Sequence, residues 1–222
     1  MVADMGPIST GSVYVSFDRT FGSGLNQVSV ETAFHPRLNA VSLEFRHEFV
    51  TYRQFWDESA RRHFATALER YNADFDERTL VNRPRQTRSV YGRVNGRLEW
   101  QTMRFTAVHV SYPVIEIGYR FRDTGQGSRP FFTTLMRSAR AEEAHGSGGQ
   151  TESRQIRMNF TRAQAAYLVE IFDQAFLMGL VEMHRDQEPT TATFQWDDFD
   201  DFDDFDGFGD SHDFYAPYDE NG

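Results

Sequence analysis

Arginine is the residue type whose number and spacing could do chemistry in this chain. All 23 residues counted as lysine or arginine are arginine. Eleven of them fall in residues 83–140, against the three acids Glu99, Glu116 and Asp123, so this segment carries a formal charge of +8. A guanidinium presents planar, forked donors that match phosphate and stack on bases. Coding bias is the simplest cause of an all-arginine composition, but this chemistry is available whatever the cause.

Several of these arginines stand close in sequence to aromatic residues. Binding a nucleic-acid backbone requires cations along a groove, and stacking of bases requires nearby aromatic faces. The sequence therefore predicts a site for single-stranded nucleic acid made of Arg93, Arg97, Arg104, Arg120, Arg122, Tyr91 and Trp100. The alternative is a solvated sheet face, with the aromatic rings in the core and the arginines paired to the acidic C-terminal tail. Tyr119 shares one face of its predicted strand with Ile115 and Ile117, so we expect it in the core.

The C-terminal part of the chain has the opposite charge. Residues 197–222 carry ten Asp and one Glu and no basic residue, so the formal net charge of −10 becomes +1 when these eleven charges are left out. Phenylalanine recurs at every third position between the aspartates, at Phe199, Phe202, Phe205 and Phe208. We expect a disordered tail over residues 185–222 that competes with nucleic acid for the arginines, because tethering gives it a high effective concentration. The Phe repeat predicts a docking segment for a protein partner, whereas simple solubilisation is the alternative.

Other kinds of site lack support in the sequence. The absence of cysteine excludes disulfides, thiolate catalysis and cysteine-bound zinc. The seven histidines lack metal-binding spacing, and neither a nucleophile elbow nor a phosphate-binding loop occurs. We therefore expect no catalytic residues, no metal and no cofactor. No apolar run reaches the ~18–20 residues that span a bilayer, and the first residues do not resemble a signal peptide. The expected location is cytoplasmic, without a membrane partner.

The first predicted unit covers residues 11–76. Apolar and polar residues alternate over 13–19, 27–34 and 40–50, which predicts strands. Thr51 and Gln54 fit a capping box, so a helix is expected from there to about residues 72–76, with Arg61 among its solvent-facing residues. A polar linker follows over residues 77–88.

The second predicted unit covers residues 89–184. Asn95 and Gly96 separate two alternating runs, which predicts a β-hairpin. Further strands are expected over 104–111, 114–122, 130–140 and 154–160, with a loop at 142–153. Thr161 and Gln164 form a second capping box, and the helix predicted from there to about 181 is apolar on most of its circumference. A helix of this kind packs on more than one side, against a sheet and either another helix or another subunit. It therefore suggests self-association, and a homodimer is expected.

The predicted fold class is α+β, with two strands-then-helix units forming curved antiparallel sheets backed by helices, and a disordered acidic tail. The pattern leaves true duplication open. This layout resembles the PUR-domain proteins and, more loosely, the Whirly proteins; the closest stretch is residues 47–58, which looks like the last strand and helix start of a PUR repeat. The resemblance implies binding of single-stranded DNA or RNA on a curved sheet.

The tail is similar to the acidic tails of bacterial and phage single-strand-binding proteins, which recruit partners and compete with nucleic acid. It departs from them because its Phe repeat is followed by further residues, up to Gly222. The alternative function is a protein-interaction adaptor, in which the tail docks on a partner and the folded body is a dimerising scaffold.

Overall fold

The computed structural model describes residues 5–18, 24–83, 86–124 and 127–187. Of the predicted tail over residues 185–222, residues 185–187 belong to the last helix, so the predicted start of the tail is wrong; the rest, including Phe199, Phe202, Phe205 and Phe208, lies outside the described residues. Within them the chain forms eleven β-strands and three α-helices, so the fold is α+β with sheet predominating. No helix of this described part has both the length and the apolar character needed to cross a bilayer.

The elements follow the order strands, helix, strands, helices, as the sequence predicts. The first strands and helix are β1 (Ile8–Asp18), β2 (Leu25–His35), the 3₁₀ turn η2 (Pro36–Leu38), β3 (Ala40–His47), β4 (Val50–Asp57) and α1 (Glu58–Asp76). The later elements are β5 (Arg88–Asn95), β6 (Arg97–Thr102), β7 (Val108–Ser111), β8 (Val114–Asp123), β9 (Ser128–Met136), β10 (Glu143–His145), β11 (Ile156–Phe160), α2 (Arg162–Phe172) and α3 (Gln174–Gln187).

All these strands belong to one antiparallel sheet rather than to two. Among the described residues the strand order is β10-β7-β6-β4-β3-β2-β1-β11-β9-β8-β5. The first four strands form the middle of the sheet, and the later strands extend it on both sides. The two predicted units are therefore not separate sheets, because strands of the second unit pair with both β4 and β1.

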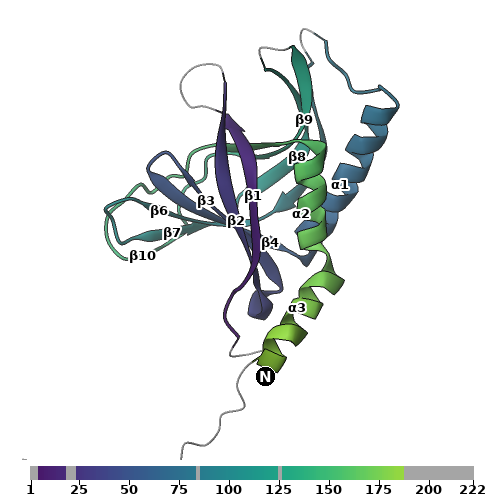
Figure 1. The fold of residues 1–222 in the computed structure, drawn as a ribbon. Coiled ribbons are helices and arrows are strands. Elements are labelled where there is room, and N and C mark those ends of the chain that lie inside the picture. Colours follow the sequence, from purple (N-terminus) through teal and green to yellow (C-terminus); the bar gives the residue numbers. More distant parts are fainter. Residues whose placement is uncertain (1–4, 19–23, 84–85, 125–126, 188–222) are drawn as a thin grey trace, which may run out of the picture. The chain divides into compact units, whose positions relative to one another are not determined.

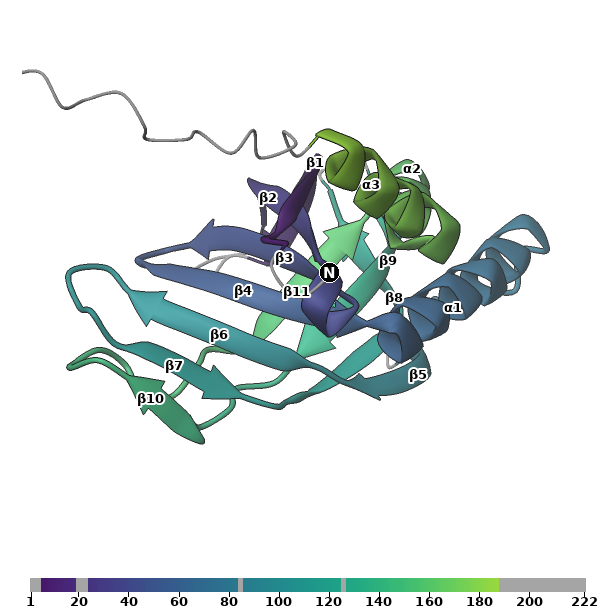
Figure 2. The same ribbon diagram turned by 90° about the horizontal axis from the view of Figure 1, so that it is seen from below.

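A bent ribbon joins the two ends of this sheet. Only Gly96 separates β5 from β6, and only Tyr112 and Pro113 separate β7 from β8. The Gly96 amide donates to the Pro113 carbonyl at 3.0 Å, so the β6–β7 pair continues directly into the β5–β8 pair. The sheet must therefore curl until its ends meet, and both views show it strongly curved (Figures 1 and 2).

The hairpin predicted at Asn95 and Gly96 is wrong, because β5 and β6 pair with other strands and not with each other. Gly96 has a different role in the bend. A Cβ atom there would lie 2.5 Å from Cδ1 of Ile115, so the missing side chain allows the ribbon to close over the core.

One face of the curled sheet encloses the apolar core, and the helices cover its open side. α1 contacts β4, β5 and β8, whereas α2 contacts β1, β9 and β11. The Phe64 ring on α1 lies at 5.1 Å from Phe132, 6.0 Å from Phe160 and 5.3 Å from Phe172, measured between centroids. Edge-to-face aromatic pairs of this kind fix the position of a helix on a sheet. Tyr119 is buried here, as predicted.

The first helix begins later than its predicted capping box. Thr51 and Gln54 lie in β4, and α1 starts after Asp57, whose Oδ1 accepts from the Ala60 amide at 2.7 Å. Strand pairing prevails because Tyr52 and Trp56 alternate into the core between β3 and β6. The second capping box is confirmed, with reciprocal bonds of 2.8 and 3.3 Å between Thr161 and Gln164.

The predicted second helix is interrupted at Asp173, which ends α2 and whose Oδ1 accepts from the Phe176 amide at 2.8 Å. The predicted exposure of Arg61 is wrong, since this residue is fully buried. Its guanidinium donates to the carbonyls of Asn39 and Trp56 and to Oε1 of Gln174, which ties α1 to the η2 turn and to α3.

Candidate nucleic-acid interface

The outer face of the bent ribbon carries four of the predicted site residues. Side chains alternate between the two faces of a strand. On one side of the ribbon, Val94, Leu98, Ile115 and Ile117 are buried in the core. Arg93, Arg97, Arg120 and Arg122 occupy the alternating positions, on the opposite, outer face. The structure therefore brings these four arginines onto one surface.

Two of them meet a third arginine at a single carboxylate. Asp18, at the end of β1, lies 3.3 Å from Arg120, 3.3 Å from Arg122 and 3.0 Å from Arg157, measured between side-chain nitrogen and oxygen. The Asn159 amide donates to the same carboxylate at 3.1 Å. We call these five residues the Asp18 cluster. The β11 residue Arg157 is not among the residues predicted from sequence.

The Asp18 cluster has more positive charge than its carboxylate neutralises. Burial, and then the like charge of Arg157, lowers the pKa of Arg120 below its ordinary value, despite the opposing effect of Asp18. Arg122 and Arg88 lower the pKa of Arg120 further, and Arg88 stands opposite Arg120 in the β5–β8 register. Arginine nevertheless remains charged at neutral pH. A bound anion would relieve this repulsion.

A second shared carboxylate lies further along the same face. Glu116 on β8 accepts from Arg93 at 3.3 Å and from Arg137 at 3.4 Å. With the Asp18 cluster this gives a surface that we call the arginine face, which has six arginines around two carboxylates: Arg88, Arg93, Arg120, Arg122, Arg137 and Arg157 around Asp18 and Glu116.

A cavity of about 20 Å³ lies on the arginine face, lined in part by Arg88, Glu116, Arg120 and Arg157. Roughly 10–15 Å³ is enough for one water molecule. The cavity is therefore far too small for a nucleotide, and a larger ligand must lie across the arginine face rather than inside it.

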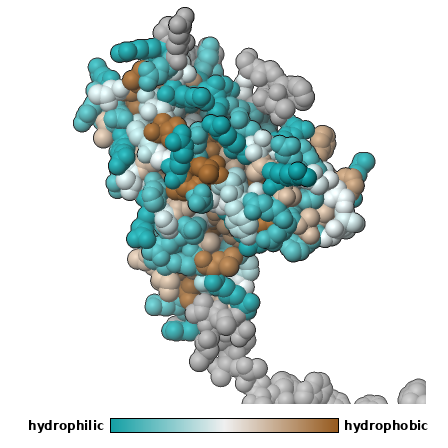
Figure 3. Space-filling model, turned by 180° about the vertical axis from the view of Figure 1, so that it is seen from behind, coloured by the Kyte–Doolittle hydropathy of each residue, from teal (hydrophilic) through white to brown (hydrophobic). Residues whose placement is uncertain are grey.

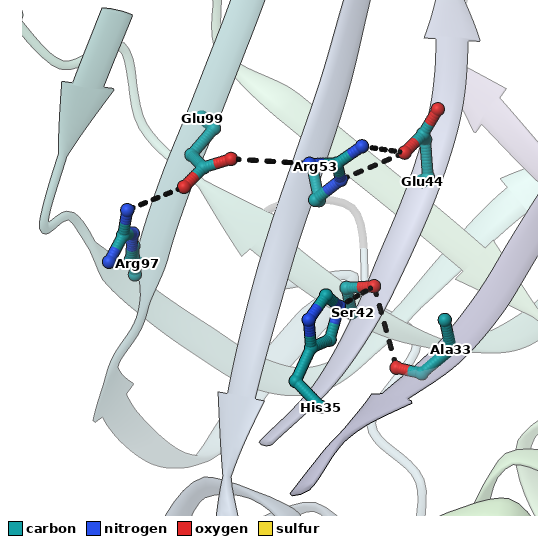
Figure 4. Close-up of polar contacts among 7 residues, drawn as sticks. All are labelled: Ala33, His35, Ser42, Glu44, Arg53, Arg97 and Glu99. Carbon is teal, nitrogen blue, oxygen red and sulfur yellow. Dashed lines mark hydrogen bonds and ion pairs between the residues drawn. The ribbon is translucent and has the colours of Figure 1, made fainter. Parts of the chain in front are cut away.

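A different network occupies the outer face of β3, β4 and β6 (Figure 4). Arg53 donates to Glu44 at 2.6 Å and lies 3.6 Å from Glu99, which in turn accepts from Arg97 at 2.6 Å. We call these four residues the ion-pair ladder. It holds equal numbers of arginines and carboxylates, so Arg97, although on the predicted surface, is already neutralised.

A histidine lies beside the ladder. His35 Nε2 is 2.9 Å from the Ser42 hydroxyl, which is also 3.4 Å from the Ala33 carbonyl (Figure 4). Burial, followed by the charge of Arg53, lowers the pKa of His35 below its ordinary value. Ser42 is buried, so the pair lacks the exposed hydroxyl that a nucleophile needs.

The remaining predicted residues do not join this surface. Trp100 is only 1% exposed and donates to the Gln150 carbonyl at 2.7 Å, so its predicted stacking on a base is wrong. The half-buried Tyr91 donates to Asp74 at 2.6 Å; burial and then this bond raise the pKa of Tyr91. Arg104 lies in the turn after β6, with a positive φ of 74°.

An exposed aromatic ring that the sequence prediction missed lies on the correct face. Tyr14 is 63% exposed and shares the outer side of β1 with Ser16 and Asp18, whereas Val13 and Val15 point inward. The alternation of apolar and polar residues over 13–19 is the signal that indicates an outward-facing Tyr14, although this residue lies outside the arginine-rich segment 83–140. Seen from behind, the molecule shows apolar residues in small patches among hydrophilic ones (Figure 3).

Comparison with curated proteins gives no match, and comparison with solved structures gives none either. A family model described as "Uncharacterised Treponema protein" matches residues 9–179. This match runs from β1 into α3, so it includes the ribbon, the Asp18 cluster and the ion-pair ladder. The chain therefore belongs to that family.

Proposed function

We propose that this protein binds single-stranded nucleic acid across its arginine face, without a chemical step. The observation that carries the proposal is the sharing of Asp18 by Arg120, Arg122 and Arg157. Each guanidinium has five N–H donors, so one carboxylate leaves most of the donors in this cluster for another acceptor. Phosphate oxygens suit these forked donors.

A single strand would use both parts of this surface. Its phosphates would lie over Arg88, Arg120 and Arg157, while a base stacks on the exposed Tyr14 ring of β1. Stacking tolerates any base, and backbone contacts carry no sequence information, so we expect weak sequence preference. The feature that this proposal shares with a PUR-like protein is the curved antiparallel sheet backed by helices; the single sheet does not divide into the two separate units of that expectation.

The acidic tail and self-association complete the proposal. The aspartates between Phe199 and Phe208 would compete for the same arginines, and the phenylalanines would dock on a protein partner. The homodimer and the cytoplasmic location are parts of this proposal.

Fluorescence anisotropy of labelled single-stranded DNA and RNA tests the proposal directly. The full chain and residues 1–189 would be titrated at two salt concentrations. Binding should weaken with salt, and it should tighten when the tail is removed. For single strands the slope of log K against log salt is about −0.7 per neutralised phosphate, which counts the contacts.

A matched pair of variants separates this site from general positive charge. Arg120→Ala with Arg122→Ala should weaken binding, whereas Arg46→Ala with Arg53→Ala removes the same charge from the outer face of β3 and β4 and should have little effect. Equal losses in both variants would contradict a defined site. If neither the full chain nor residues 1–189 binds, the proposal is rejected and the adaptor function is favoured. The tail would then be used to isolate protein partners.

A further inference from the structure

A hollow of about 250 Å³ lies on the outer face where the ribbon bends. Phe55 and Ala40 form part of its wall, and Asn95, Arg97 and Tyr112 come from the ribbon itself. Pockets for drug-sized ligands measure roughly 300–1,000 Å³. The hollow therefore fits a single ring system better than an extended cofactor.

The lining combines flat apolar surfaces with a few polar groups. Tyr112 is 47% exposed, and the Phe55 ring is covered on one side by the Arg97 guanidinium, whose Cζ lies 5.4 Å from the ring centre. Asp57 and Asn95 supply a carboxylate and a carboxamide to the same hollow. The carboxylate spends one acceptor site on the Ala60 amide and has others left.

We propose that this hollow binds one base of the strand that crosses the arginine face. The inference rests on the proposed function and extends it from phosphate contacts to base contacts. The exposed Tyr112 ring suits stacking of a base. A carboxylate accepts hydrogen bonds from exocyclic amino groups, as acidic side chains do with cytosine. Bases that carry an amino group are therefore preferred over thymine and uracil.

The position of the hollow supports this occupant. Arg93, which contacts Glu116 on the arginine face, lies two residues before Asn95 on the same outer side of β5. At about 3.3 Å per residue these side chains stand some 7 Å apart along the strand. A backbone held by Arg93 and Arg137 would bring a base to the bend of the ribbon. An aliphatic or phenylalanine ligand would make no use of the remaining acceptor sites of Asp57 or of the Asn95 carboxamide.

The test compares three 15-nucleotide single strands that differ only in base: cytosine, thymine, and abasic sites along the same backbone. The full chain should bind the cytosine strand about a hundredfold more tightly than the abasic one, as expected for two stacked bases, one on Tyr14 and one in the hollow. Tyr112→Ala should reduce that difference by about tenfold, which is the share of the base in the hollow. Phe49→Ala, which removes an exposed ring from the β3–β4 turn, should preserve it.

A second variant tests the carboxylate without loss of the helix cap. Asp57→Asn keeps a good capping residue before α1, and it should reduce the preference for cytosine over thymine. If Tyr112→Ala distinguishes the three strands as strongly as wild type does, the hollow does not bind a base, while the phosphate contacts stand. If wild type binds none of the three, the proposed function is itself overturned.

Discussion

The Asp18 cluster and the ion-pair ladder are built from the same materials on the same face of one sheet. In the ladder two arginines meet two glutamates, so charge is balanced within the network. In the Asp18 cluster three arginines converge on one carboxylate, and the pKa of Arg120 falls below its ordinary value. The two regions differ by only one arginine, three against two. What distinguishes them is the number of acids that strand register places opposite the arginines.

The largest expected effect is on ligand binding. Arg88→Ala combined with Arg120→Ala should weaken binding of a single strand by tenfold or more, since each contact between ionised groups contributes about 1.5–3 kcal/mol. The salt slope should become shallower by about 1.4, the value for two lost phosphate contacts. Titrations at three salt concentrations measure both quantities. An unchanged salt slope would show that the strand contacts a different surface.

Removing the shared carboxylate should separate stability from binding. Asp18→Asn should lower the free energy of unfolding by about 1–2 kcal/mol, because partly buried guanidinium groups lose a charged acceptor. The same change should tighten nucleic-acid binding, because the internal competitor for the arginines has gone. Urea denaturation and anisotropy provide the two measurements. Weaker binding in a folded variant would mean that Asp18 positions the arginines instead of competing for them.

Removing one carboxylate from the ion-pair ladder should change stability and nucleic-acid binding much less than Asp18→Asn does. Glu44→Gln is expected to alter the free energy of unfolding by about 0–1 kcal/mol, the usual range for an exposed ion pair. It should leave binding within error, because Arg53 keeps Glu99 as a partner. Tighter binding in this variant, comparable to that of Asp18→Asn, would remove the contrast between the two regions.

The smallest effect concerns pH. The pKa of His35 is lowered in the folded protein, so as pH falls the unfolded chain takes up its proton first. The contribution of neutral His35 to the free energy of unfolding is fully present above pH 6.5, the ordinary pKa of histidine. It is lost as the pH falls through the lower pKa that His35 has in the folded protein. The Tm should therefore decrease between pH 7 and pH 5, and it should decrease less in His35→Gln. Burial lowers the pKa of His47 as well, so part of the decrease should remain.

Local patterns in the sequence predicted much of the fold but less of the site. Alternation located most strands, and the capping box at Thr161 and Gln164 is present because α2 follows β11 directly. The box at Thr51 failed because its residues pair with β3 and β6, a contact that no local pattern reveals. Asn95 and Gly96 look like a hairpin turn, yet Gly96 serves a bend that closes on Ile115.

The site depended on pairings between distant parts of the chain. Arg120 and Arg122 could be chosen from composition and alternation. Their contact with Asp18 spans about a hundred residues, and it exists only because β11 lies between β1 and β9. Trp100 is close to arginines in sequence, which suggested that it binds a base. Its position in β6 places its side chain on the inner face, in the core. Local periodicity predicts where strands lie, but it does not show which strands pair with each other in the sheet.

The position of β11 also has a consequence for how the chain folds. This strand, residues 156–160, separates β1 from β9 and is the last strand of the described part to be synthesised. During translation the early meander β1–β4 can form, but the sheet cannot close until β11 has left the ribosome. Pairing over such sequence distances slows folding, since the loop-closure entropy must be overcome first. The unpaired edge of β1 is therefore exposed for most of synthesis, which makes it the place where a nascent chain is most prone to aggregate.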